Sequence, residues 1–435
     1  MTPSLSSSSR YRVLFAAIGG LLFDGVELGL MPVASLSVSQ SLLGDAFTPT
    51  LGGDWFARFT AALMLGAAVG GIFLGGLGDR VGRIRALGVS ILFYSVFAGL
   101  GAFAKTQEQM WVLRFLVGLG VGGVWPNAVA LAAECWPDRS RPIIAGLLGA
   151  ALNGGILILS QIARTWHITP ESWRWIFQLA AAPAVLGLLV LTVVPESPLW
   201  LVARSSRRKE AQSVLGAGSQ SLLASAAPRR FESALRELLR PPLLRLTLLG
   251  ILIGSIPMLG AWAASKWMIP WADKVGGTNE PGYKAITQSW WALGAVLGSF
   301  FGAQIAAWLG RRRAYATMSA AATALTTLMF LGTAPLQASF LPIVFAQGFV
   351  ATLFFGWLPL YLPELFPARV RAAGSGIAYN VGRFATAFGV MAAGTLFAAM
   401  GGSYPRVGAS CGLIYLLGLV AIWWAPDTTG KKLDA

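Results

Sequence analysis

Long apolar stretches recur along the whole chain, and polar residues gather in the shorter stretches between them. A helix that crosses a bilayer needs about 20 mostly apolar residues. Twelve segments meet that requirement: 13–33, 57–77, 86–104, 110–131, 143–163, 174–194, 243–265, 286–308, 314–332, 338–361, 372–396 and 405–424. The pattern predicts an all-α membrane protein with twelve transmembrane helices.

The longest connection lies between the sixth and seventh apolar segments and divides six spans from six. Two stretches of it, 206–215 and 229–239, mix arginines with apolar residues. That mixture favours amphipathic helices on the membrane surface. The expected organisation is a short cytoplasmic tail (1–12), a six-helix bundle (13–194), a cytoplasmic linker (195–242), a second six-helix bundle (243–424) and a cytoplasmic tail (425–435).

The two halves repeat one motif at the same place. The pattern E-x-x-P-x-R-x-R runs from Glu134 to Arg141 in the first half and from Glu364 to Arg371 in the second. Both copies follow the fourth span of their half. Parallel six-span repeats around a central site are a transporter architecture. The repeat therefore predicts two six-helix bundles related by pseudo-two-fold symmetry.

Composition argues against a soluble protein and against an enzyme. Charged residues make up 12% of the chain, about half of their share in soluble domains. Two cysteines and one histidine are too few for a Cys/His zinc site or a disulfide framework. No cluster of nucleophile, base or metal ligand indicates an enzyme. We expect neither a metal nor another cofactor.

The basic residues, which give the chain a net charge of +15, indicate by their placement how it is oriented in the membrane. With the N-terminus in the cytoplasm, most of the 33 lysines and arginines fall in the inner loops, as the positive-inside rule requires. Both termini are then cytoplasmic, and the basic loops contact anionic lipid rather than nucleic acid. We expect a multi-pass protein of the cell (inner) membrane that functions as a monomer.

A glycine-rich basic loop, GGLGDRVGRIR at 75–85, joins the second and third spans. Glycines let helix ends approach closely, an aspartate can cap the next helix, and arginines can pair with carboxylates of neighbouring helix ends. Together with the repeated motif and the loop after the sixth span, these are the expected gating and structural residues: Gly75, Gly78, Asp79, Arg80, Gly82, Arg83, Glu134, Arg141, Glu196, Arg311, Glu364 and Arg371.

This loop resembles the G-x-L-x-D-R-x-G-R signature of the major facilitator superfamily. Three more segments resemble motifs of its sugar porters and related organic-ion carriers, namely RFLVGLGVGG at 114–123, PESPLWL at 195–201 and PDTTGK at 426–431. The resemblance extends from the first span to the tail. It implies a twelve-span carrier that works by alternating access.

The chain departs from the family pattern in two places. Leu199 replaces the usual arginine after the sixth span, and in the second half Ala307 and Trp308 stand where the first half has Asp79 and Arg80. If gating at the cytoplasmic side uses matched ion-pair clusters in both halves, the loss of these two charges predicts a weaker cluster in the second half.

The first span carries two acids, Asp24 and Glu27, in an apolar setting. Acids within a membrane helix are costly and normally face a cavity, and residues three apart share a helical face. The DGVE sequence resembles the D-G-x-D of aromatic-acid and sialate proton symporters. We predict proton coupling at Asp24 and Glu27 with Arg114 of the fourth span. The alternative is a carboxylate locked in a permanent salt bridge with Arg114.

Arg383 is the best candidate for binding an anion. It lies twelve residues beyond Arg371, at the inner boundary, and hence about 18 Å deep at 1.5 Å per residue. Snorkelling does not explain a base at that depth, and we expect Arg383 to be the only base near mid-bilayer. The expected substrate-binding residues are Arg383, Asn380, Tyr379, Trp125, Asn127, Trp357 and Asn153. Trp267, Trp271, Trp290 and Trp291 are expected at the outer membrane interface.

The residues favour an organic anion over a sugar. The paired glutamines of hexose carriers are missing from 254–260, and their fifth-span glutamine is missing from 149–155. An arginine binds a carboxylate through two parallel hydrogen bonds. We predict a secondary active transporter that moves a small organic carboxylate by alternating access, coupled to protons. The alternatives are a proton-coupled sugar or polyol transporter and a receptor that binds without translocating.

Overall fold

The computed structural model describes residues 6–136, 141–198, 200–202, 205, 236–277, 279–367 and 370–430. Within these ranges the regular structure is entirely helical, and twelve helical segments are long and apolar enough to cross a membrane. The predicted fold class is confirmed. The first predicted amphipathic helix (206–215), residues 229–235 of the second (229–239) and the last residues of the tail lie outside the described ranges; residues 236–238 of the second are helical.

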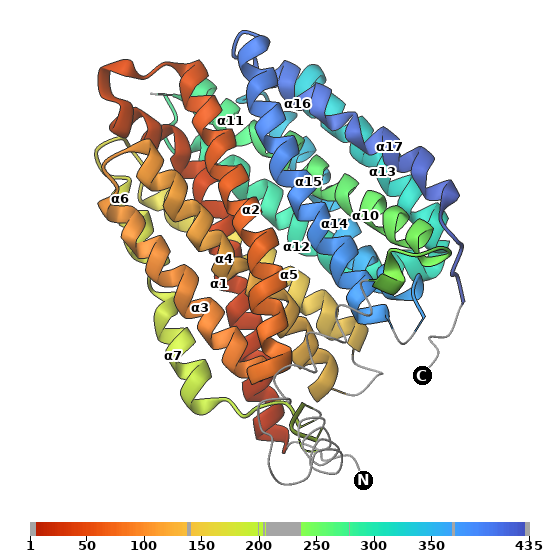
Figure 1. The fold of residues 1–435 in the computed structure, drawn as a ribbon. Helices are drawn as coiled ribbons and strands as arrows, with labels where there is room; N and C mark the ends of the chain where they lie inside the picture. Colours follow the sequence, from red (N-terminus) through yellow and green to blue (C-terminus); the bar gives the residue numbers. More distant parts are fainter. Residues whose placement is uncertain are drawn as a thin grey trace.

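The first half of the chain forms six consecutive spans, whose helices are labelled in Figure 1. The sixth consists of two short helices in succession, the second of which begins at a proline. The helices are α1 (Ser7–Leu43), α2 (Pro49–Val81), α3 (Arg83–Leu100), α4 (Gln107–Cys135), α5 (Arg141–Thr165), α6 (Arg174–Ala180) and α7 (Pro183–Val193).

The second half forms the other six spans. Its helices are α10 (Leu243–Leu259), α11 (Met268–Gly276), α12 (Tyr283–Leu309), α13 (Arg311–Thr327), α14 (Phe340–Glu364), α15 (Arg371–Ala399), α16 (Tyr404–Gly412) and α17 (Ile414–Ala421). A π-helical turn (Gly260–Ala264) and a 3-10 turn (Ser265–Trp267) connect α10 to α11. The seventh span therefore continues to Gly276, well beyond the predicted end at 265.

The two halves stand side by side, and both termini lie at the lower end of the bundle (Figure 1). We call this the termini end and the other the opposite end. The main contacts between the halves pair α5 with α12 and α2 with α15. The space between these two helix pairs is where a substrate site can form.

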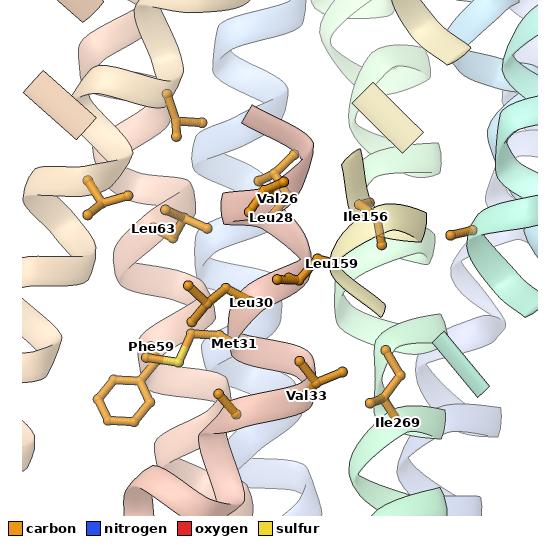
Figure 2. Close-up of a cluster of buried hydrophobic side chains, with 14 of the residues drawn as sticks. Val26, Leu28, Leu30, Met31, Val33, Phe59, Leu63, Ile156, Leu159 and Ile269 are labelled. Carbon is orange, nitrogen blue, oxygen red and sulfur yellow. The ribbon is translucent and has the colours of Figure 1, made fainter. Parts of the chain in front are cut away.

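Helix α1 packs at the centre of the first half. Its apolar side chains meet those of α2, α5 and α11 in one buried cluster (Figure 2). Gly25 makes this approach possible, because a Cβ there would lie 1.8 Å from the carbonyl oxygen of Leu152 on α5, and Gly155 has the same relation to Leu22. The backbones of α1 and α5 are in direct contact. This contact fixes the position of the neighbouring Asp24.

The two halves are joined firmly at the opposite end. The buried Lys284 ammonium lies 3.0 Å from the Asp273 carboxylate in its own half, and it donates hydrogen bonds to Ser37 Oγ and to the Ile168 carbonyl in the other half. Phe56 of α2 also packs edge-to-face against Trp267 of the second half in the same region, with ring centres 5.2 Å apart. Opening the molecule at this end requires the contacts between the halves to break, namely those of Lys284 with the first half and that of Phe56 with Trp267.

Candidate substrate cavity

A cavity lies between the two halves. Its wall is mostly apolar and includes aromatic side chains from both halves. The aromatic lining residues are Trp125, Trp262, Trp291, Phe355 and Tyr379. The charged lining residues are Asp24, Lys266 and Arg383. A pocket of this kind suits a small apolar or aromatic molecule that carries charge.

Asp24 is presented to the cavity by α1. Its side chain is 1% exposed, and Oδ1 has no hydrogen-bond partner among the described residues. Arg383 of the other half lines the same cavity. An acid that lines a cavity without a fixed hydrogen bond to this oxygen can exchange a proton with the cavity contents.

Arg383 reaches from the second half to the first. Its Nη1 donates a hydrogen bond to the Ala67 carbonyl of α2 at 3.1 Å, and its Cζ lies 5.2 Å from the centre of the Tyr379 ring. A guanidinium carries five donor hydrogens in a planar fork. The contact with Ala67 orients the group and leaves further donors for a carboxylate in the cavity.

Lys266 is a site residue that sequence reasoning missed. We placed it outside the seventh span, but the structure buries it to 1% exposure in the cavity wall. Its ammonium lies 3.4 Å from the centre of the Trp291 ring. Arg383 is thus not the only base deep in the bundle. The apolar run MIPWA at 268–272, directly after Lys266, is the sequence signal that the span continues.

Three of the four tryptophans expected at the membrane interface lie inside the protein. Trp267, Trp271 and Trp291 are buried, whereas Trp290 is 40% exposed. Trp291 donates its indole N–H to Gln347 at 2.8 Å, which fixes the ring in the cavity wall. The interface prediction is therefore wrong for these three, because tertiary contacts, rather than lipid headgroups, surround them.

Four of the seven predicted substrate-binding residues line the cavity: Trp125, Asn153, Tyr379 and Arg383. Asn153 also joins the halves, since its Nδ2 donates a hydrogen bond to Ser299 Oγ at 2.8 Å. Its amide therefore lies where the two halves meet beside the cavity.

The other three predicted residues lie outside the lining. Trp357 is buried in the second half and donates its indole N–H to the Arg311 carbonyl at 3.0 Å. Asn127 donates to the Leu74 carbonyl and packs against Gly78, and Asn380 packs against Gly71. Asn127 and Trp357 thus bond to backbone carbonyls of their own halves. A substrate-binding role for these three residues stays a prediction.

Glu27 forms a salt bridge inside the first half. Its Oε2 lies 3.0 Å from Arg114 Nη1, and both side chains are 1% exposed. Arg114 Nη2 also donates to the Glu27 backbone carbonyl at 3.3 Å. Neither residue lines the cavity. The two acids of the first span thus differ. Glu27 forms the salt bridge with Arg114 that was the alternative to proton coupling, whereas Asp24 faces the cavity.

Removing one partner of this buried pair leaves the other charge uncompensated. We expect Arg114→Ala to lower the free energy of unfolding by about 3–5 kcal/mol, measured by denaturant unfolding of the purified protein. Arg58→Ala is the control because Arg58 is half exposed in its pair with Asp54. Such an exposed ion pair contributes about 1 kcal/mol or less to the free energy of unfolding. Equal stability of the two variants would contradict a structural role for Arg114.

The predicted gating residues form ion pairs at the termini end. Arg83 lies 3.2 Å from Glu134 in the first half, and Arg311 holds Glu364 through two contacts of 2.7 and 3.1 Å in the second. The Thr428 hydroxyl also donates to Glu364. Thr428 thus adds a contact to the second cluster. Because the side chains of Asp79 and Arg141 lie outside the described part of the structure, the weaker second cluster stays a prediction.

The remaining gating residues are placed as follows. Glu196 accepts the backbone N–H of Ile84 at the start of α3, and Gly82, at φ +119°, is needed because a Cβ would lie 2.1 Å from this carboxylate.

Gly75 packs closely against Pro126 and Gly78 against Asn127. Arg80 is exposed, and Arg371 donates to the Phe366 carbonyl. The side chains of Asp79 and Arg141 lie outside the described part of the structure.

Comparison with known proteins agrees with this architecture. A sequence model of the family described as "Sugar (and other) transporter" matches residues 13–435. The cis,cis-muconate transport protein of Acinetobacter baylyi is 29% identical over 90% of this chain and 87% of its own length. The gallate transporter of Pseudomonas putida is 28% identical over 92% of this chain and 87% of its own length.

Among solved structures, the fold is similar to the partially occluded inward-open conformation of the xylose transporter XylE from E. coli. The TM-score is 0.72 with 18% identity, covering 98% of this chain and all of that one. The match to the family covers nearly the whole sequence, and the structure has the family's twelve spans in two similar halves. The chain belongs to the sugar (and other) transporter family of the major facilitator superfamily and is a membrane transporter rather than an enzyme.

Proposed function

We propose that this protein is a secondary active transporter of a small organic carboxylate. The observation that carries the proposal is Arg383, a guanidinium in an apolar, aromatic-lined cavity between the two halves. A fork of donors in such a setting binds a planar carboxylate through parallel hydrogen bonds, and the aromatic wall accommodates an apolar body. Two relatives are a muconate transport protein and a gallate transporter, which supports an organic acid as the substrate.

Alternating access is supported by how the two halves meet. The contacts of Lys284 join the halves at the opposite end, while the ion pairs Arg83–Glu134 and Arg311–Glu364 each lie within one half at the termini end. The halves can therefore move as two bodies about the central cavity, with the Lys284 contacts forming and breaking. Rocking of repeats around a fixed site is the transport mechanism of such folds.

Proton coupling is assigned to Asp24. Asp24 lines the same cavity as Arg383 from the other half, and when ionised it is the acid there that can offset the charge of this base. When Asp24 takes up a proton, Arg383 becomes available to the carboxylate of the substrate. The proton and the substrate therefore bind together. Glu27 and Arg114 support this site indirectly by fixing α1 against α4.

The orientation follows from the basic loops. Arg80, Arg83, Arg311 and Arg312 all lie at the termini end, which is cytoplasmic by the positive-inside rule. The transporter then works in the cell (inner) membrane, as a monomer whose basic loops contact anionic lipid. A reporter fused to the C-terminus is expected to read as cytoplasmic, and a periplasmic reading would reverse the assignment.

The proposal is tested by transport into proteoliposomes. Benzoate, muconate and gallate are compared with xylose and inositol, as labelled solutes and as competitors, and counterflow at equal pH separates a carrier from a receptor that binds without translocating. We expect counterflow with at least one carboxylate and with neither neutral solute. Counterflow with xylose or inositol alone would replace this function by the sugar or polyol alternative.

A further inference from the structure

The charges in the cavity wall do not balance. Two bases, Arg383 of α15 and Lys266 of the turn between α10 and α11, face one acid, Asp24. Arg383 and Asp24 have opposite charges and line the same cavity from opposite halves. An uncompensated charge inside a membrane protein is costly. The positive charge of Lys266 therefore calls for a partner of opposite charge, which no described residue of the cavity lining other than Asp24 supplies.

Lys266 is buried without a hydrogen-bond acceptor. The side chain is 1% exposed, and Nζ has no such partner among the described residues. It lies over two indole rings, 3.4 Å from the centre of Trp291 and 5.6 Å from that of Trp262. An aromatic face attracts a cation but accepts none of its three donor hydrogens in the way an oxygen does. The ammonium is therefore free to bind an anion in the cavity.

The backbone around Lys266 holds it in place. The helix is interrupted here by the π-helical turn Gly260–Ala264 and by the 3-10 turn that contains Lys266 itself. On one side Ser265 donates to the Gly260 carbonyl at 3.0 Å, and on the other Trp267 donates to the Ala263 carbonyl at 3.1 Å. Such interruptions of a helix occur at functional sites and at the substrate sites of transporters.

We propose that Lys266 is a second anion-binding residue and that the preferred substrate is a dicarboxylate. One carboxylate binds Arg383 and the other binds Lys266, with the apolar middle of the molecule against the aromatic wall between them. When Asp24 carries the coupled proton, two bases and a dianion sum to zero charge. A neutral loaded cavity lets the carrier reorient without moving net charge through a region of low dielectric constant. This inference rests on the proposed carboxylate transport.

The test compares dicarboxylates with their half-esters, which have one charge fewer and nearly the same shape. Muconate, adipate and terephthalate, and the monomethyl ester of each, are titrated against the purified protein by isothermal calorimetry. We expect at least one diacid to bind the wild type about tenfold or more tightly than its half-ester, the effect of one charge-assisted hydrogen bond. In Lys266→Met that preference disappears, while the affinity for the half-ester changes by about twofold or less.

Two further variants serve as controls. Lys266→Arg keeps a cation and is expected to keep the preference, whereas Lys274→Met makes the same substitution at an exposed lysine of α11 and is expected to behave as wild type. Binding of the half-ester by Lys266→Met shows that the variant is folded. If no diacid is preferred by the wild type, or if the preference survives in Lys266→Met, the inference is wrong.

The outcome also separates this inference from the function on which it rests. Binding of half-esters or benzoate without any preference for a diacid leaves carboxylate transport intact and removes only the role of Lys266. If neither the diacids nor the monoanions bind the wild type, the proposed function fails, and the dicarboxylate inference fails with it.

Discussion

Arg383→Ala is expected to reduce the affinity for a transported carboxylate by about tenfold to a hundredfold, the range for hydrogen bonds to a charged group. The variant removes the guanidinium that lines the cavity and its hydrogen bond to the Ala67 carbonyl. Arg383→Lys keeps the charge but loses the planar fork, so its affinity should lie between those of wild type and Arg383→Ala.

The measurement is ligand binding to purified protein, with the amount of folded protein determined separately. Binding to the native state raises thermal stability by mass action, so the ligand-induced shift in Tm should shrink in the same order. Arg58→Ala, an arginine of α2 outside the cavity lining, is the matched control. If wild type, Arg383→Lys and Arg383→Ala all bind the same neutral sugar equally well, the organic-anion assignment is wrong.

Asp24→Asn is expected to abolish accumulation driven by a pH gradient while solute exchange continues. The amide has nearly the shape of the protonated acid but releases no proton, so the variant stays in the form that leaves Arg383 available to substrate. It can still reorient with substrate bound. Transport is therefore uncoupled rather than lost.

Two assays on the same vesicles separate these effects. Uptake is measured with an imposed inward proton gradient, and counterflow is then measured at equal pH. Asp54→Asn is the control, because Asp54 pairs with Arg58 at the opposite end, outside the cavity lining. Unchanged accumulation by Asp24→Asn would exclude Asp24 as the proton site, and loss of both activities would indicate that its charge is needed for reorientation itself.

The sequence alone determined the architecture. A span requires only a run of about 20 apolar residues, which is a local property, so each of the twelve segments was predicted within a few residues except where a helix continued past polar residues. The repeat of Glu134 at Glu364 likewise predicted two similar halves. It also indicated that Glu134 and Glu364, the acids that pair with Arg83 and Arg311, lie at matching helix ends. Local spacing also indicated that Asp24, Glu27 and Arg383 are too deep to be ordinary interface residues.

Only the tertiary structure decided what each of these polar residues contacts. Glu27 and Asp24 share a helical face in sequence terms, but packing places Arg114 beside Glu27 and leaves Asp24 in the cavity wall. Lys266 resembles the end of a span because a lysine at that point usually reaches water. It is instead buried against Trp291 by helices far away in the sequence. Hydropathy records how apolar a segment is but not which neighbour covers it, and in this protein the neighbour determines whether a charge is structural or available to substrate.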